Sequence, residues 1–234
     1  MLPVVILCGG LASRLYPMTQ QMPKSLIKVH GKPFIFHQLE LLRQNHVTDV
    51  IMCVGNFGDA VEQFVGSEKY GINIKYSYDG KTLLGTGGAI KNALHLLPDT
   101  FIVLYGDSYL DVSFKPIIDK FNVEKKPILM TVYHNNNKDD KSNILFIDGN
   151  ILEYNKKHPT QLMEHLDYGI SIMTKHIFDS YPEIFDLADL LSGYVKIDEV
   201  SAFESKVPFF EIGSFSGIEK FKKHIKGEQN DYRN

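Results

Sequence analysis

The first half of the chain alternates between two hydrophobic patterns. Short continuous apolar runs rich in β-branched residues predict buried strands, and segments whose apolar residues recur every three or four positions predict helices. The runs predict strands at 3–8, 49–55, 72–78 and 100–107, and the periodic segments predict helices at 33–45, 58–66 and 86–97. This alternation of strand and helix is typical of an α/β fold, in which a mostly parallel sheet carries helices on both faces.

After about residue 125 the pattern changes to short strands and hairpins. Asp148-Gly149-Asn150 between two apolar runs predicts a β-hairpin, and the polar run 135–143 predicts a loop. The remaining segments predict strands at 127–134, 166–174, 196–200 and 207–213, helical turns near 177–192, and an amphipathic helix at 215–225. We expect one domain over 1–226, in which the second half, 126–226, folds over the carboxyl edge of the sheet formed by 1–125. A frayed tail is expected at 227–234.

Composition and charge exclude several classes of protein. Hydrophobic residues make up 44% of the 234 residues and charged residues 23%, which are ordinary values for a globular domain. The net charge is −3, with 25 basic and 28 acidic residues and no basic block, so nucleic acid is not expected as a partner. No apolar run approaches the ~20 residues of a membrane-spanning helix, and the first residues do not resemble a signal peptide. Cys8 and Cys53 lie in apolar runs and are expected to be reduced thiols of a cytoplasmic protein.

The segment 4–29, VVILCGGLASRLYPMTQQMPKSLIKV, carries the strongest chemical signal in the sequence. In an open parallel sheet, ligands bind beyond the carboxyl ends of the strands, and Gly9 and Gly10 follow the first predicted strand. Glycine lets backbone N–H groups approach phosphate oxygens closely, and Arg14 and Lys24 add a planar fork and a compact charge suited to phosphate. The segment therefore predicts a loop that binds a polyphosphate; a tight turn with two solvated cations is the alternative.

Two common phosphate-binding motifs do not fit this segment. The G-x-G-x-x-G pattern of dinucleotide-binding proteins fails at Leu11 and Arg14, and the Gly-Lys-Ser/Thr of the P-loop is absent. A longer pattern does fit, and it resembles the signature Gly-Gly-x-Gly-Thr-Arg-Leu-x-Pro-x-Thr…Pro-Lys of the sugar-1-phosphate nucleotidyltransferases. Ala12 and Ser13 replace the family's Gly-Thr, which keeps the side chains small but removes some backbone freedom at position 12. The matching residues are Gly9, Gly10, Arg14, Leu15, Pro17, Thr19, Pro23 and Lys24.

The resemblance continues along nearly the whole chain. Five further segments are similar to blocks of the same family and occur in the family's order. They are LLGTGGAI at 83–90, LYGDSYLDVSF at 104–114, ILEYNKKHP at 151–159, LDYGISIM at 166–173 and FFEIGSFSGIEKF at 209–221. The chain therefore resembles a sugar-1-phosphate nucleotidyltransferase over both of its halves.

The resemblance implies a fold and a reaction. The fold is a Rossmann-like, mostly parallel mixed sheet flanked by helices, the GT-A-like core of nucleotidyltransferases, with 1–125 as the nucleotide-binding half and 126–226 as the sugar-phosphate-binding half. The implied reaction is attack by a sugar 1-phosphate oxygen on the α-phosphorus of a nucleoside triphosphate, with Mg²⁺ as cofactor. Because this nucleophile is already an anion, catalysis depends on positioned cations and a divalent metal rather than on a general base.

The resemblance also assigns charged residues to the reaction. Arg14 is expected on the β- and γ-phosphates and Lys24 near the transferred α-phosphate. Asp107, at the end of the strand 100–107, is expected to bind Mg²⁺, because a hard carboxylate oxygen is the ligand that this ion prefers. Glu211 occupies the place of the family's second metal-binding aspartate, with a purely structural role as the alternative. Arg14, Lys24 and Asp107 are the expected catalytic residues.

The remaining implied contacts are with the nucleoside and the sugar. Lys157 aligns with the lysine that holds the sugar phosphate in the family, and Lys156 replaces that motif's glutamate, so either lysine is a candidate phosphate ligand. Asp167 and Gly169 take the places of an asparagine and a glycine that face the sugar. The expected nucleotide-binding residues are Leu7, Gly9, Gly10, Gly85 and Thr86.

Short sequences within these blocks narrow the choice of nucleotide and sugar phosphate. ILCGGL, YNKK and DYGIS resemble bacterial D-glycero-D-manno-heptose 1-phosphate or mannose 1-phosphate guanylyltransferase-like proteins, which favours GTP and a role in surface-glycan synthesis. UTP- or CTP-dependent transfer and a phosphocholine-type acceptor stay open. Ala12, Lys156 and Glu211 keep a non-catalytic nucleotide-binding module open as well, and a homo-oligomer is also open.

Overall fold

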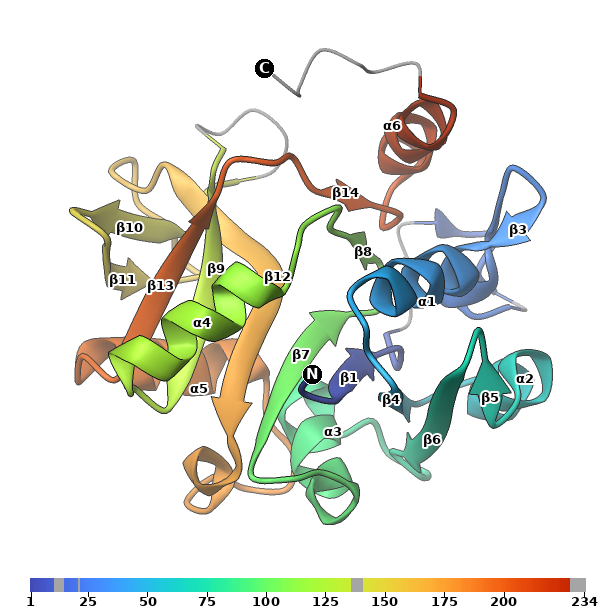
Figure 1. Cartoon of the computed structure of the whole chain (residues 1–234), viewed down its shortest axis with the longest axis horizontal. Coiled ribbons are helices and arrows are strands. Elements are labelled where there is room, and N and C mark those ends of the chain that lie inside the picture. Colours follow the sequence, from blue (N-terminus) through green and yellow to red (C-terminus); the bar gives the residue numbers. More distant parts are fainter. Residues whose placement is uncertain (11–14, 21, 136–140, 228–234) are drawn as a thin grey trace.

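The computed structural model describes residues 1–10, 15–20, 22–135 and 141–227. Its main feature is a ten-stranded sheet with the order β11-β10-β12-β7-β1-β4-β6-β5, in which β9 pairs with β12 and with β13 (Figure 1). The strands are β1 (Val4–Leu7), β4 (Asp49–Val54), β5 (Glu68–Lys69), β6 (Ile72–Tyr78), β7 (Thr100–Tyr105), β9 (Ile128–His134), β10 (Ile144–Ile147), β11 (Asn150–Tyr154), β12 (His165–Thr174) and β13 (Val200–Ser205).

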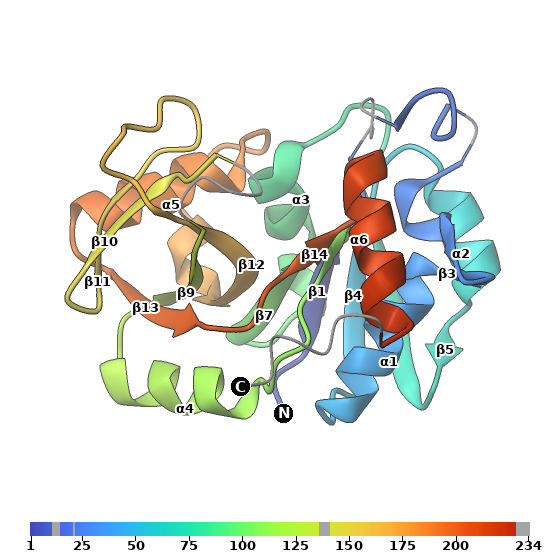
Figure 2. The ribbon, with the colours of Figure 1, turned by 90° about the horizontal axis from the view of Figure 1, so that it is seen from above.

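Helices flank this sheet on both sides, as Figure 2 shows. They are α1 (Phe34–Gln44), α2 (Gly58–Val65), α3 (Gly85–Ala93), α4 (Lys115–Glu124), α5 (Leu187–Lys196) and α6 (Phe215–Ile225), with short 3-10 turns η2 (Lys24–Leu26), η3 (Leu94–Leu96) and η4 (Lys175–Phe178). Two small ribbons complete the fold, β2 (Lys28–Val29) with β3 (Lys32–Pro33), and β8 (Ser108–Tyr109) with β14 (Phe210–Glu211). The predicted mostly parallel mixed sheet flanked by helices is confirmed.

The continuous apolar run of β1 reflects burial on both faces of the sheet. β1 lies between β7 and β4 and is parallel to both. Val5 belongs to the core formed with α3 and α5, whereas Val4 and Ile6 belong to the core formed with α1, α2 and α4. Alternate residues of a strand point to opposite faces, so a central parallel strand has no face left for polar side chains.

The second half continues the sheet, which differs from the expected arrangement over its carboxyl edge. β12 is antiparallel to β7 and to β9, and β9 is parallel to β13. Eight of the ten residues of β12 are buried, on both faces of the strand, including Ile170, Ser171 and Ile172, so this strand is a central one. Of the second half, β14 and α6 are the elements that lie beyond the ends of β7 and β1 (Figure 1).

The predicted strand at 196–200 is wrong. Lys196 ends α5, Asp198 has a positive φ of 58°, and the strand β13 begins only at Val200. The polar residues of this segment form the end of a helix and a turn, and the alternating sequence that follows them forms the strand. The predicted helix at 86–97 is also divided, into α3 and the 3-10 turn η3.

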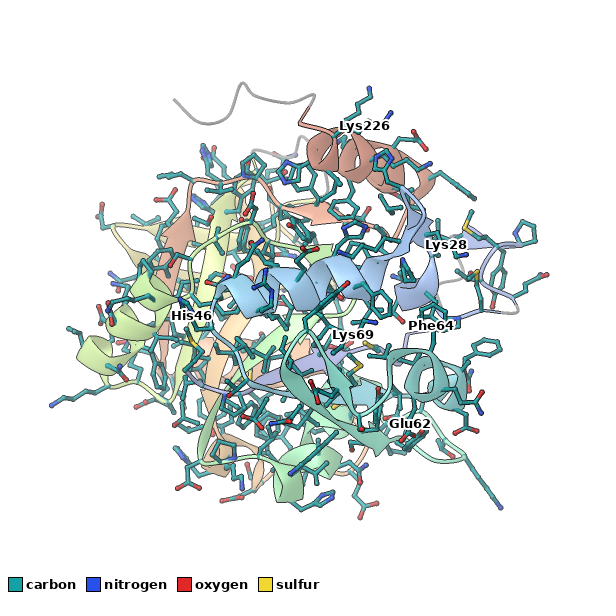
Figure 3. All side chains as sticks on the ribbon, turned by 45° about the vertical axis from the view of Figure 1, so that its right-hand side comes forward. Lys28, His46, Glu62, Phe64, Lys69 and Lys226 are labelled. Carbon is teal, nitrogen blue, oxygen red and sulfur yellow. The ribbon has the colours of Figure 1, made fainter. Side chains whose placement is uncertain are left out.

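The open edge of the sheet at β5 is covered by charge and aromatic packing. Lys69 Nζ lies 4.3 Å from the centroid of the Phe36 ring of α1, and the ring of Phe64 of α2 lies 5.5 Å from the same ring. Figure 3 shows Phe64 and Lys69 together on this side of the molecule. A very short, charged edge strand is a common protection against pairing with another chain.

Every helix within the described residues is too short or too polar to cross a lipid bilayer.

Candidate active site

The loops that follow β1, β6 and β7 meet around a cavity of about 250 Å³. It lies at the carboxyl edge of the parallel strands, where ligands bind in open α/β sheets. All five residues predicted to bind nucleotide line it, as do Lys24 and Asp107. The lining residues are Leu7, Cys8, Gly9, Gly10, Lys24, Ser25, Cys53, Asp79, Leu83, Gly85, Thr86, Ala89, Tyr105, Gly106 and Asp107.

Glycine allows the strand ends to approach one another at this edge. The Gly106 N–H donates to the Leu7 carbonyl at 3.0 Å, and a Cβ on Gly106 would lie 2.5 Å from that oxygen and 3.0 Å from Cys8 Sγ. A Cβ on Gly9 would lie 3.3 Å from Gly55 N. Gly9, Gly10, Gly85 and Gly106 line the cavity and form a glycine floor, where a ligand can approach the main chain closely.

Lys24 and Asp107 form an ion pair in the lining of this cavity. Lys24 Nζ lies 2.6 Å from Asp107 Oδ2, and the two side chains are 18% and 29% exposed. Lys24 begins η2, and Asp107 comes two residues after the end of β7, so the pair joins the loop after β1 to the loop after β7. Arg14, the other predicted catalytic cation, lies outside the described residues.

The LLGTGGA segment forms the turn into α3 and is docked against the loop before α5. Gly85 has a φ of +74°, and a Cβ there would lie 2.4 Å from the Phe185 carbonyl oxygen. The N–H groups of Gly87 and Gly88 donate to the same oxygen at 3.1 and 3.2 Å. Thr86 Oγ1 donates to Asp186 Oδ1 at 2.9 Å and accepts from the Leu187 N–H at 2.8 Å. These contacts fix the wall of the cavity formed by Gly85 and Thr86.

A second, more polar cavity of about 620 Å³ adjoins the first. Thr86, Tyr105 and Asp107 line both cavities. The other lining residues come from the second half and from the loop after β7: Ser108, Lys141, Asn143, Lys156, Leu166, Asp167, Pro208, Phe209, Phe210, Glu211, Ser214, Ser216, Gly217 and Lys220. Asp107 thus stands at the boundary between a glycine-floored cavity and a polar one.

The two adjacent lysines of the predicted sugar-phosphate site point to different places. Lys156 lines the second cavity, and its Nζ lies 5.4 Å from the centroid of the Tyr105 ring. Lys157 lines neither cavity; its Nζ lies 2.6 Å from Asp189 Oδ1 of α5, and its side chain is 64% exposed. The structure therefore presents Lys156, not Lys157, to a ligand in the polar cavity.

Asp167 of β12 is held in a fixed orientation at the wall of the second cavity. Its Oδ2 accepts from the hydroxyls of Tyr105 and Tyr154, each at 3.3 Å, and its Oδ1 accepts from the Gly169 N–H at 3.0 Å. Burial raises the pKa of Asp167, and the charge of Lys156 and these hydrogen bonds act in the opposite direction. Gly169 has a φ of +96°, and a Cβ there would lie 3.3 Å from the Tyr105 ring.

Glu211 is brought next to Asp107 by the small ribbon of β8 and β14. Glu211 pairs with Ser108, and the Ile212 N–H donates to the Asp107 carbonyl at 2.9 Å. The Glu211 carboxylate accepts from the Gly213 N–H at 2.7 Å and from the Ser214 hydroxyl at 2.8 Å, which orients it at the second cavity.

The carboxylates of Asp107 and Glu211 fit Mg²⁺ if phosphates and water supply its other ligands. The described residues contain no group of three His, Cys, Asp or Glu side chains that could hold a metal ion by themselves. Mg²⁺ is commonly held by one or two carboxylates together with substrate phosphates and water. Asp107 and Glu211 line one cavity and satisfy that requirement, with the phosphates supplied by the ligand.

Residues 3–143 match the family model described as nucleotidyl transferase. The chain belongs to the nucleotidyl transferase family. The resemblance inferred from the sequence is thereby confirmed, and the loop after β1 is the part of this nucleotidyl transferase that carries the family signature.

Relatives of this nucleotidyl transferase differ in the base and sugar that their names give. A D-glycero-alpha-D-manno-heptose 1-phosphate guanylyltransferase from Campylobacter jejuni is 28% identical over 177 residues, which cover 76% of this chain and 78% of the relative. A UTP–glucose-1-phosphate uridylyltransferase from Synechocystis is 27% identical over 229 residues, which cover 89% of this chain and 57% of the relative. The crystal structure of HddC from Yersinia pseudotuberculosis complexed with GMP-PN has a TM-score of 0.82 and 26% identity, and covers 96% of this chain and 100% of that one.

Several residues that line the site of this nucleotidyl transferase were not selected from the sequence. Asp79 and Tyr105 could have been found, because one follows β6 and the other ends β7, and the carboxyl ends of parallel strands form the binding edge. Asn143 and Lys220 do not follow a parallel strand, so the sequence did not mark them as residues of the site. Lys220 belongs to an amphipathic helix whose polar face reads as solvated, and only the folding of α6 over the sheet edge brings it to the cavity.

Proposed function

We propose that this protein joins a sugar 1-phosphate to a nucleoside triphosphate, giving a nucleotide-sugar and pyrophosphate. The observation that carries the proposal is the position of Asp107, paired with Lys24, where two cavities of different character meet. The first cavity has the glycine floor that suits a nucleotide's phosphates. The second has the lysine, carboxylate and hydroxyl groups that suit a phosphorylated sugar.

The chemistry requires two polyanions to meet. An oxygen of the sugar 1-phosphate forms a bond to the α-phosphorus, the bond from that phosphorus to the bridging oxygen breaks, and the electron pair leaves with pyrophosphate. The nucleophile is already ionised, so charge neutralisation and alignment provide the rate enhancement. We assign the transferred α-phosphate to Lys24, which is paired with Asp107 at this boundary, and the β- and γ-phosphates to Arg14.

Mg²⁺ held by Asp107 and Glu211 would neutralise phosphate charge at the same boundary. Lys24 would then exchange its ion pair with Asp107 for a contact with a substrate phosphate. Lys156 is proposed to hold the phosphate of the sugar and Asp167 to accept hydrogen bonds from sugar hydroxyls.

For the substrates we propose GTP with heptose 1-phosphate or mannose 1-phosphate, used in the cytoplasm for surface-glycan synthesis. The names of the Campylobacter relative and of the HddC complex support this choice. Uridylyl transfer is the second candidate, because the Synechocystis relative covers most of this chain.

The test is a measurement of pyrophosphate release with Mg²⁺, each nucleoside triphosphate in turn, and a panel of sugar 1-phosphates. Phosphocholine is included as an acceptor that is not a sugar. We expect release with one triphosphate and a small set of sugar phosphates, and none when a divalent cation is chelated. Absence of release with every pair would leave a nucleotide-binding module as the function.

A further inference from the structure

Gln38 is a fully buried amide on an otherwise apolar face of α1. Ile35 and Leu42, three residues before it and four after it, lie on the same face and belong to the core formed with α1, α2 and α4. All three side chains are 0% exposed. Burying an amide costs stability unless hydrogen bonds replace its contacts with water. The hydrogen bonds of Gln38 must offset this cost, which an apolar side chain would avoid.

The amide uses both of its donors on the connection that carries Asp107. Gln38 Nε2 donates to the Tyr105 carbonyl at 3.0 Å and to the Ser108 carbonyl at 2.7 Å. Because both partners are carbonyl oxygens, which accept and cannot donate, the NH₂ end of the amide faces them. The other end, Oε1, is buried and accepts no hydrogen bond from the residues that the structure describes. Gln38 therefore acts through its two donors, on either side of Asp107.

Holding both carbonyls fixes the direction of the Asp107 side chain. The chain between them includes the φ and ψ angles of Gly106 and Asp107, and glycine is the least restricted of all residues. Two backbone hydrogen bonds act on the same connection: the Gly106 N–H donates to the Leu7 carbonyl at 3.0 Å, and the Asp107 carbonyl accepts from the Ile212 N–H at 2.9 Å. Gln38 supports the connection from α1, and this support depends on the type of side chain.

We propose that Gln38 is a positioning residue, which orients the Asp107 carboxylate at the boundary of the two cavities so that it can bind Mg²⁺. The inference rests on the proposed function and adds to it a residue that lines neither cavity. Groups that orient the ligands of a metal ion from behind commonly change metal affinity or activity by about 10- to 100-fold when they are replaced. Gln38 is in this position relative to Asp107, because it holds the peptide groups on both sides of the ligand.

A purely structural role, in which Gln38 only holds α1 against the sheet, is the competing explanation. Asn45, directly after α1, provides the comparison. Its Nδ2 donates to the Val112 carbonyl at 3.1 Å, and its Oδ1 accepts from the Phe114 N–H at 2.8 Å. Asn45 thus holds the same connection between β7 and α4, but at a point beyond Asp107. Loss of either amide should destabilise the protein, whereas only loss of Gln38 should weaken metal binding.

The experiment compares the wild type with Gln38→Met and with Asn45→Ala as the matched control. Methionine is unbranched, apolar and a good helix former, so it removes both donors with little change in shape. Water proton relaxation, which protein-bound Mn²⁺ enhances, gives the affinity for Mn²⁺ in the presence of a stoichiometric imido analogue of GTP or of UTP. Pyrophosphate release gives the Mg²⁺ concentration at half-maximal rate, and urea denaturation gives the stability of each protein.

In Gln38→Met we expect the affinity for Mn²⁺ to fall about 10- to 100-fold and the Mg²⁺ concentration at half-maximal rate to rise by a similar factor. High Mg²⁺ should restore much of the rate, because the carboxylate of Asp107 is still present and only its orientation is released. Asn45→Ala should be less stable than the wild type but should bind both ions as the wild type does.

An unchanged affinity for Mn²⁺ in Gln38→Met would overturn the inference. Equal losses of affinity in the two variants would also overturn it and would establish a structural role. If the wild type does not bind Mn²⁺ with either analogue, the inference fails together with the metal site. If the wild type binds Mn²⁺ but releases no pyrophosphate with any triphosphate, the proposed function fails, and the Mn²⁺ affinities still decide the role of Gln38.

A measurement on the wild type decides the matter if Gln38→Met does not fold. The side-chain amide resonances of Gln38 should shift in nuclear magnetic resonance spectra when Mg²⁺ is added together with the analogue, because the carbonyls that they contact flank the metal ligand. Those of Asn45 should stay in place. Resonances of Gln38 that do not respond to Mg²⁺ would contradict the proposed coupling.

Discussion

Lys24 and Asp107 neutralise each other's charge in the lining of the first cavity. Lys24 Nζ lies 2.6 Å from Asp107 Oδ2, with both side chains mostly buried. A partly buried charge without a partner would be costly, so the pair removes a penalty that either residue alone would carry. Under the proposed function, phosphate would replace Asp107 as the partner of Lys24, and a metal ion would replace Lys24 as the partner of Asp107.

Lys24→Ala tests the cation at the residue scale. We expect kcat to fall about 100- to 1,000-fold, because the preorganised charge at the transferred phosphate is lost. Lys28→Ala, an exposed lysine of β2, is the control. Steady-state pyrophosphate release measures the effect, and circular dichroism checks the fold. Near-normal turnover in Lys24→Ala would show that the α-phosphate is bound elsewhere.

Lys156 and Lys157 are adjacent in sequence, but we expect their replacement to have different effects on KM for the sugar 1-phosphate. Lys156→Ala should raise KM for the sugar 1-phosphate about 10- to 100-fold, because a charged hydrogen bond to phosphate is lost. Lys157→Ala should change KM by about twofold or less, since its exposed pair with Asp189 contributes little. Titration of the sugar 1-phosphate at saturating triphosphate measures both. The reverse order of effects would contradict the arrangement seen here.

The residue scale also shows where sequence reasoning stops. The positions of Gly9, Gly10 and Asp107 follow from strand ends, and a strand end is readable from an apolar run that terminates in glycine. The choice between Lys156 and Lys157 could not be predicted. Adjacent residues beyond the end of a strand have no fixed alternation, and only the position of Asp189 on α5 decides which lysine is turned away.

At the level of elements, α3 is positioned by the absence of side chains on its first turn. A Cβ on Gly88 would lie 2.2 Å from the Glu183 carbonyl oxygen, and a Cβ on Gly87 would lie 2.2 Å from the Phe185 ring. Both glycines reduce intrinsic helix propensity, by about 1 kcal/mol each relative to alanine. They permit the close contact between α3 and the loop before α5 that forms the wall containing Thr86.

Alanine at these two positions should therefore destabilise the protein although alanine favours helix. We expect Gly88→Ala to lower the free energy of unfolding by about 1–3 kcal/mol, because a backbone carbonyl must move. Gly87→Ala should lower it less, since the Phe185 ring can shift, and in a Phe185→Ala background the Gly87→Ala change should cost less than it does in the wild type. Urea denaturation followed by circular dichroism measures each value. An increase in stability in Gly88→Ala would show that this contact is loose.

The elements were the most predictable part of the fold. Strands buried on both faces, such as β1, β4 and β7, are continuous apolar runs, and α1 and α6 have clear helical periodicity. The prediction for 196–200 failed because its two apolar residues, Ile197 and Val200, lie three positions apart, which is not the alternation of a strand. The stretch is too short to separate a helix end from a strand by periodicity. The pairing of β12 between β7 and β9 was not predictable, since it joins residues distant in sequence.

For the molecule as a whole, β12 joins the two halves into one sheet. It pairs with β7 on one side and with β9 on the other, and the core between the sheet and α3 and α5 contains residues of both halves. Removing the second half would expose the β7 edge and the apolar face that α5 covers. Such an edge is a template for aggregation rather than a stable boundary.

Residues 1–125 expressed alone should therefore not fold, and the full chain should unfold in one cooperative transition. Coincidence of the transitions seen by circular dichroism and by tyrosine fluorescence in the full chain, which has 12 tyrosines, would show this cooperativity. A soluble 1–125 fragment with dispersed amide resonances would contradict it.

The backbone floor of the first cavity limits how such a protein can change its substrate. Main-chain N–H groups cannot be exchanged by point mutation, so the phosphate end admits few useful variants. The short connection from Asp79 to Leu84 is different, because the side chains of Asp79 and Leu83 line the same cavity. Replacing that connection would therefore reshape one wall of the cavity while leaving its glycine floor unchanged.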